Sequence, residues 1–101
     1  MTEAPPPLPS LPEAYQALAS GRTADVLAWA GRAPAEGVAA LPWKALRAVA
    51  LSLSQRPQEA LPEYQWLCAN EPGNPGHWSN LGNCLCELER EREALEPLQK
   101  A

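Results

Sequence analysis

The residues from Trp78 to Ala101, WSNLGNCLCELEREREALEPLQKA, decide the fold. In the first half of this stretch, large apolar residues recur every three or four positions, which is the spacing of one face of a helix. After a charged run, Ala94, Leu98 and Ala101 repeat that spacing. The pattern predicts two amphipathic helices joined by a charged turn. Because Gly82 has no side chain, we expect the two helices to pack closely there, with the small Ala94 facing it.

At these positions the sequence resembles the tetratricopeptide repeat, whose signature of W-x2-L-G-x2-Y, then A-x3-F, then P recurs every 34 residues. Leu85 stands where the family usually has Tyr. One period earlier the pattern recurs and Pro72 closes it, but Lys44 and Arg47 replace Trp and Leu, and Trp43 is the candidate to fill the gap. A second period back gives a degenerate copy. In chain order the matching residues are Ala14, Ala17, Val26, Ala30 and Ala33; then Ala48, Leu51, Ala60, Tyr64 and Leu67; then Trp78, Leu81, Gly82, Ala94, Leu98 and Ala101.

The resemblance implies an all-α fold of three stacked antiparallel helix pairs, a TPR-like right-handed α-solenoid whose first repeat is degenerate. We expect residues 1–9 to form a Pro-rich extended or disordered lead and residues 10–101 to form one TPR-like domain. Within the domain, the expected repeats are residues 10–40 (degenerate), residues 41–74, and residues 75–101, the last truncated at its second helix. The segment Pro6-Pro7-Leu8-Pro9 also fits the loose PxxP pattern of polyproline ligands, but a plain tail is the expectation.

Capping and proline signals predict where the helices begin and end. Ser10 and Glu13 form a capping box for a first helix over about residues 11–20. Pro62 and Pro97 fall inside helices, where a proline costs about 3 kcal/mol, so we expect a bend or a late start. The second, third and fourth helices are expected over residues 22 or 23 to 33, 42 to 53 and 57 to 70. The fifth is expected after a loop at residues 71–76, and the sixth from residue 94.

The composition limits the classes of partner. The chain has 101 residues, enough for one domain, and eight basic residues against twelve acidic ones give a net charge of −4. Because no basic patch remains to neutralise phosphates, we do not expect a nucleic acid partner. No signal peptide and no apolar run of membrane-spanning length is present, so a cytoplasmic protein is expected. The three cysteines are therefore expected to be reduced thiols.

The resemblance implies a function in protein binding, because the first helices of stacked repeats line a concave surface that suits a peptide or protein segment. The early part of this groove is mostly apolar and the late part is polar. An alternative for Leu11, Tyr15 and Leu18 is burial against the Pro-rich lead or a missing domain. The groove residues that the resemblance implies are Leu11, Tyr15, Leu18, Ala45, Val49, Ser52, Ser79, Asn80, Asn83 and Cys86.

Some repeats of this family grip the acidic C-terminal tails of chaperones with a clamp of Lys, Asn and Arg. Only one of the corresponding places in this chain holds a residue of suitable chemistry, namely Asn80. We therefore do not expect chaperone tails to bind. The five places hold Leu11, Tyr15, Leu46, Gly76 and Asn80.

The sequence offers little for catalysis, and we expect no catalytic, cofactor-binding or metal-binding residues. His77 is the single histidine and is expected to be a solvated residue at a helix start. Cys84 and Cys86 lack the two-residue spacing of a redox or zinc motif, and on a helix they point in different directions. With Cys68, they are expected to pack in the core or the groove.

The last predicted helix lacks a polar closing helix, so we expect Leu95 and Leu98 to be exposed at a C-terminal edge. Our hypothesis is that the chain is a fragment of a longer protein and that this edge supports homo-oligomerisation. The main interpretation is a non-catalytic protein-interaction scaffold. One alternative is an N-terminal docking or regulatory segment of a larger bacterial enzyme, such as a TPR-containing sulfotransferase or other transferase. Another is an assembly protein that works by homotypic stacking.

Overall fold

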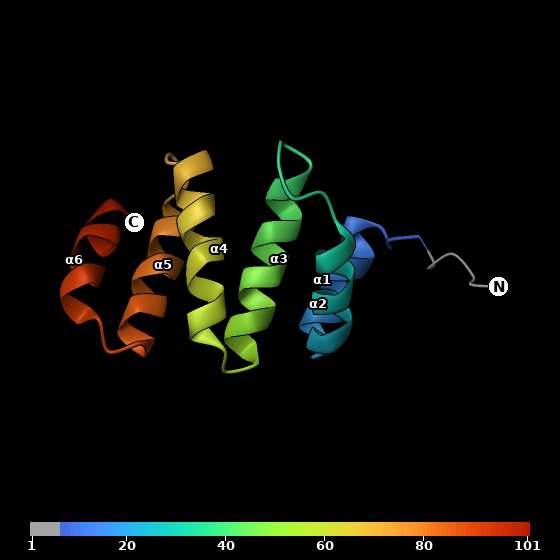
Figure 1. Ribbon diagram of the computed structural model, residues 1–101, viewed down its shortest axis with the longest axis horizontal. Helices are drawn as coiled ribbons and strands as arrows, with labels where there is room; N and C mark the ends of the chain where they lie inside the picture. Colours follow the sequence, from blue (N-terminus) through green and yellow to red (C-terminus); the bar gives the residue numbers. More distant parts are fainter. Residues whose placement is uncertain (1–6) are drawn as a thin grey trace.

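The computed structural model describes residues 7–101, and in this part of the chain it contains α-helices and no strands (Figure 1). The expected all-α class is therefore confirmed. Each helix contacts the next one in the chain, and α1 also contacts α3. The helices are α1 (Leu11–Ala19), α2 (Thr23–Arg32), α3 (Ala40–Leu53), α4 (Pro57–Asn70), α5 (Pro75–Glu87) and α6 (Glu91–Lys100).

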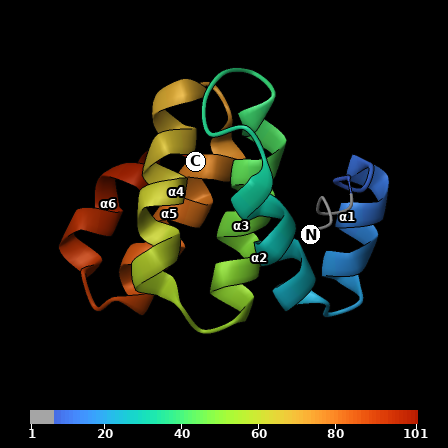
Figure 2. The same cartoon turned by 45° about the vertical axis from the view of Figure 1, so that its right-hand side comes forward.

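The helices follow one another along the long axis of the molecule, as both ribbon views show (Figures 1 and 2). The molecule measures 52 × 26 × 24 Å, and its radius of gyration is 14.3 Å. A compact domain of about 100 residues has a radius of gyration near 13 Å, so this fold is elongated. No helix in the described residues is long and apolar enough to cross a membrane.

Local capping signals fix several helix ends where the sequence predicts them. The Ser10 side chain accepts a hydrogen bond from the Glu13 amide at 3.4 Å, so α1 begins at Leu11. The span of α4 is also the predicted one, with Pro57 in its first turn. Pro62 and Pro97 lie inside α4 and α6 as expected, but neither helix starts late.

Three helices begin earlier than predicted. Helix α3 begins two residues before Pro42. Helix α5 begins at Pro75, because the Asn74 side chain caps it by accepting a hydrogen bond from the Gly76 amide at 2.9 Å. Helix α6 begins at Glu91 instead of residue 94, since acidic side chains suit the first turn of a helix. The predicted charged turn is therefore confined to residues 88–90.

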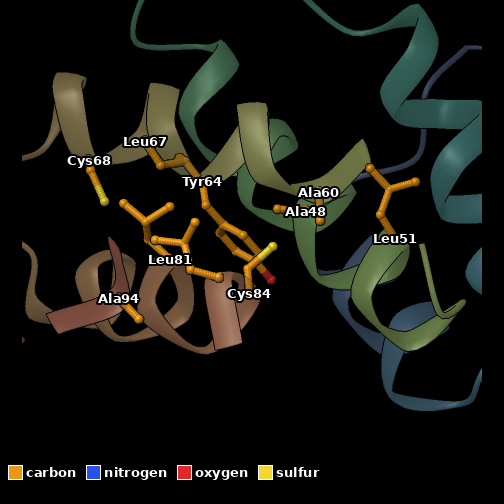
Figure 3. Close-up of a cluster of buried hydrophobic side chains, with 10 residues drawn as sticks. Ala48, Leu51, Ala60, Tyr64, Leu67, Cys68, Leu81, Cys84 and Ala94 are labelled. Carbon is orange, nitrogen blue, oxygen red and sulfur yellow. The ribbon is translucent and has the colours of Figure 1, made fainter. Parts of the chain in front are cut away.

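Two hydrophobic clusters hold the helices together, and α3 contributes to both. Close packing around Tyr64 in the larger cluster is shown in Figure 3. The larger cluster contains Ala48 and Leu51 of α3, Ala60, Tyr64, Leu67 and Cys68 of α4, Leu81, Cys84 and Leu85 of α5, and Ala94 of α6. The smaller cluster joins α1, α2 and α3 through Ala14, Ala17, Val26, Trp43, Leu46 and Ala50.

Gly82 faces Leu98, not the expected Ala94. A Cβ atom added to Gly82 would lie 2.5 Å from Leu98 Cδ2, far inside van der Waals contact. The side chain of Leu98 thus fills the space that glycine leaves open on α5. The close approach of α5 and α6 at Gly82 is as predicted, but the partner residue differs.

The Pro-rich lead is only partly described. Leu8 is half-buried and packs against the smaller cluster, although the sequence offered little reason to expect burial there. The expected disorder of the lead falls mainly on residues 1–6, which lie outside the described residues, whereas only Pro6 of the PxxP segment does.

Candidate protein-interaction surfaces

The same tight turn joins α1 to α2, α3 to α4, and α5 to α6. Its central residue has a positive φ each time: 83° at Gly21, 60° at Gln55 and 59° at Glu89. These positions are 34 residues apart. The amide of the following residue donates to the carbonyl five residues earlier at 2.8–2.9 Å, which is the closing bond of a Schellman-type helix end. The donor and acceptor pairs are Arg22 to Ala17, Arg56 to Leu51, and Arg90 to Leu85.

An arginine follows each of these turns and pairs with a carboxylate three residues later. Arg22 Nε lies 2.8 Å from Asp25 Oδ2, and Nη2 of the other two arginines lies 2.7 Å from a glutamate oxygen. The hydrogen bonds from arginine lower the pKa values of Glu59 and Glu93. Because the side chains of these ion pairs are exposed to solvent, the pairs add little stability. They do recur at the same interval of 34 residues: an R-x-x-D/E motif begins at residues 22, 56 and 90, a signal that apolar positions alone do not give.

Two surface hollows occupy equivalent places one period apart. The first, of about 200 Å³, lies between α2 and the α3–α4 hairpin and is lined by Lys44, Arg47 and Glu63. The second, of about 390 Å³, lies beside the α5–α6 hairpin, where Trp78, Leu81 and Pro97 occupy the places 34 residues later. At these three equivalent places, charged residues line the first hollow and apolar residues line the second, although each hollow also contains residues of the other kind.

The charged lining accounts for one misfit in the repeat pattern. Arg47 Nε lies 3.0 Å from Glu63 Oε1, and Lys44 Nζ lies 3.3 Å from Oε2. The Glu63 side chain is 13% exposed, so its charge needs these partners. In the next copy, the places of Arg47 and Glu63 hold Leu81 and Pro97, which are both buried. An ion pair across one hairpin thus replaces an apolar pair across the other.

The other misfit, Lys44 in place of tryptophan, is also part of a paired exchange. Lys44 Nζ lies 5.4 Å from the ring centre of Trp66, and Lys100 Nζ lies 4.5 Å from the ring centre of Trp78. Residues 44 and 78 are one period apart, as are residues 66 and 100. Both hairpins therefore contain the same cation–π contact with the two residue types exchanged. Trp43, the candidate for this place, is buried in the smaller cluster.

The predicted groove residues lie along α1, α3 and α5 and differ in exposure. Tyr15 is 49% exposed. Asn83 and Cys86 are also exposed, and the others are half-buried. The Ser52 hydroxyl is occupied, because it shares a hydrogen bond with the Tyr64 hydroxyl at 3.1 Å. None of the predicted groove residues lines the two equivalent hollows. The half-buried groove residues are Leu11, Leu18, Ala45, Val49, Ser52, Ser79 and Asn80.

Burial against the Pro-rich lead, the alternative for Leu11, Tyr15 and Leu18, fits two of these three residues. Leu11 and Leu18 pack against the smaller cluster, as Leu8 of the lead also does. Tyr15 does not belong to that cluster. The apolar surface offered by α1 to a partner is therefore centred on Tyr15.

The predicted C-terminal edge is exposed. Leu95 is 61% exposed and Leu98 is 41% exposed, and both lie on α6. Leu98 remains accessible even though it covers Gly82. Large apolar side chains are thus accessible at this edge, as they also are at Tyr15, Val38 and Leu53.

The cysteines and the histidine differ in how far they are buried and in their neighbours. Cys68 and Cys84 are buried, and burial raises the pKa of both thiols, whereas Cys86 is exposed. His77 is not solvated as expected, since its side chain is 12% exposed and its Nε2 lies 2.8 Å from Glu71 Oε1. No group of three potential metal ligands occurs in the described part of the chain.

Comparison with known proteins adds no relative. No protein-family model matches the chain, and neither curated proteins nor solved structures gave a match. The recurring turn and the paired positions described above are therefore the observations that bear on function.

Proposed function

We propose that this chain is a non-catalytic protein-interaction scaffold of the tetratricopeptide type, in which three stacked helix pairs present α1, α3 and α5 to a peptide or protein segment. The recurrence of one turn at residues 21, 55 and 89 carries the proposal. That interval is the period of the tetratricopeptide repeat. The two exchanges of paired residues support it further, because they link α3–α4 to α5–α6 as copies of one hairpin.

A repeated hairpin places its first helices along one side of the stack of helix pairs, and such extended surfaces suit peptide binding. Tyr15 and Asn83, at opposite ends of that side, are exposed and come from α1 and α5. An aromatic ring supplies a rigid anchor and an amide supplies hydrogen bonds to a peptide backbone. The proposed ligand is thus an extended segment with an apolar residue near Tyr15 and polar groups near Asn83.

Selection from a random peptide library against the whole chain tests this function. Selected peptides would be titrated against the parent and against Tyr15→Ser and Asn83→Ser, followed by fluorescence anisotropy. We expect each substitution to weaken binding about tenfold, the effect typical of losing one anchor contact. Leu53→Ser is the matched control, because Leu53 is 57% exposed on α3 yet is not among the groove residues.

Two results would refute the proposal. The first is a selection that returns no peptide specific for the folded chain. The second is a set of peptides whose affinity is unchanged by both groove substitutions, which would move the binding surface elsewhere.

A further inference from the structure

The apolar edge of α6 has an equivalent inside the molecule that is covered. One period before Leu95 and Leu98 stand Leu61 and Tyr64 of α4. Tyr64 is only 4% exposed, whereas Leu98 is 41% exposed. The same position in the hairpin is thus buried in one copy and accessible in the other.

Helix α5 is the element that covers α4. It contacts α4 and places Leu81, Cys84 and Leu85 in the cluster that contains Tyr64. Figure 3 shows Leu81 and Cys84 beside the Tyr64 ring. The apolar residues of α5 thus follow an i, i+3, i+4 pattern, which is one face of a helix. The molecule itself shows what kind of element fits this position of the hairpin.

The charge around the α6 edge narrows the choice of occupant. Five carboxylates and three basic groups lie between residues 87 and 100. Glu93 and Glu96 are paired with Arg90 and Lys100. Of the other charged residues in this stretch, three are carboxylates, at residues 87, 89 and 91, and one is basic, Arg92, so negative charge is in excess. A second copy of the chain, with a net charge of −4 and the same acidic edge, would be repelled.

We propose that the edge formed by Leu95 and Leu98 binds an amphipathic α-helix of another protein, with apolar residues at the i, i+3, i+4 spacing of Leu81, Cys84 and Leu85 and with basic residues beside them. The helix occupies on α6 the place that α5 occupies on α4. Its leucines cover Leu95 and Leu98, and its basic side chains meet the carboxylates at the α5–α6 turn. This surface is separate from the proposed peptide groove.

A synthetic helix tests the proposal on the whole chain. The probe is a fluorescein-labelled 16-residue peptide with leucine, alanine and leucine at that spacing and lysine at its outward positions. We expect saturable binding, weakened about tenfold or more by Leu95→Glu and by Leu98→Glu, since each substitution removes a buried leucine contact. Replacing the lysines by glutamate, or adding salt, should also weaken binding.

Leu53→Glu is the matched control on α3 and should leave binding unchanged, because Leu53 lies outside the α6 edge. The melting temperature of each variant, followed by circular dichroism, separates lost binding from lost folding. Leu95→Glu keeps the test decisive if Leu98→Glu loosens α6, since Leu95 is the more exposed of the two. Tyr15→Ser should bind the probe normally.

Three results would overturn the proposal. One is the absence of binding at a probe concentration of about 1 mM, the weak limit of specific recognition. Another is equal weakening by Leu53→Glu. The third is sedimentation showing that the chain itself dimerises and that Leu98→Glu dissociates the dimer, because a second copy would then be the occupant.

Discussion

The turn residues Gln55 and Glu89 are expected to limit stability, and replacing them by glycine should raise it. Both have φ near +60°. A left-handed backbone costs an L-residue about 1–2 kcal/mol, whereas glycine adopts it freely. Glycine also lowers the stability of the folded chain by about 0.5–1 kcal/mol, because it gives the unfolded chain more conformational freedom. The net expectation is a gain of roughly 0.5–1 kcal/mol for Gln55→Gly and the same for Glu89→Gly.

Gly21 provides the reverse experiment in the same turn of the first hairpin. Its φ is +83°, and no atom lies within 4 Å of a Cβ added there. Gly21→Ala should therefore lose roughly 0.5–1 kcal/mol from the backbone alone. The three substitutions together test one conformation at three equivalent places with opposite signs.

Urea unfolding followed by circular dichroism measures these changes. In thermal melts, 1 kcal/mol corresponds to roughly 4–8 °C for a domain of this size. Gln65→Gly is the matched control, because Gln65 is exposed inside α4, where glycine should cost about 1 kcal/mol. If Gln55→Gly and Glu89→Gly destabilise the chain as Gln65→Gly does, the left-handed turns and the repeat inferred from them are refuted.

Three further predictions concern the thiols and the packing. Cys86 should react with a disulfide reagent at pH 8 faster than Cys68 and Cys84, because only thiolates attack the reagent and burial raises the pKa of those two cysteines. Equal reaction rates of the three thiols would contradict this prediction. Glu63→Ala should lower the free energy of unfolding in urea by about 2 kcal/mol, because it leaves Lys44 and Arg47 half-buried without their carboxylate. Adding Arg47→Leu should recover part of this loss, and fully additive effects would argue against the Arg47–Glu63 ion pair. Gly82→Ala should lower the free energy of unfolding by about 1–3 kcal/mol, and by much less when Leu98 is also replaced by alanine. Equal losses in the two backgrounds would exclude the close contact between Gly82 and Leu98.

The sequence predicts best what is decided locally. A serine cap and a proline in the first turn define the starts of α1 and α4, because each acts on backbone groups within three residues. The start of α6 was wrong for a local reason as well. The run of charged residues predicts a turn, but Glu91 and Glu93 suit the positive end of a helix and lie in the first turn of α6.

Contacts between helices were harder to predict, because periodicity gives the face of a residue but not its partner. Gly82 and Ala94 are both small, and their pairing was a reasonable inference from size. In the structure Leu98 reaches back over Gly82 instead. The sequence similarly predicts a solvated His77, since nothing in it indicates that Glu71 turns back toward the histidine. The groove and the edge stay predictions that need the binding experiments above.

The apparent misfits of the repeat pattern are the clearest case of information carried by pairs. Lys44 and Arg47 fail the pattern one position at a time, yet each has a partner on α4 that changes with it. The same two pairs of places thus hold an ion pair and a cation–π pair in α3 and α4, and an apolar pair and a cation–π pair in α5 and α6. A surface built on such pairs can change its preference for partners without a change of fold. In this chain the ionic version lies in the middle of the row and the apolar version lies in its last hairpin, next to Leu95 and Leu98. We therefore expect α5 and α6 to be the part of the molecule that recruits another helix.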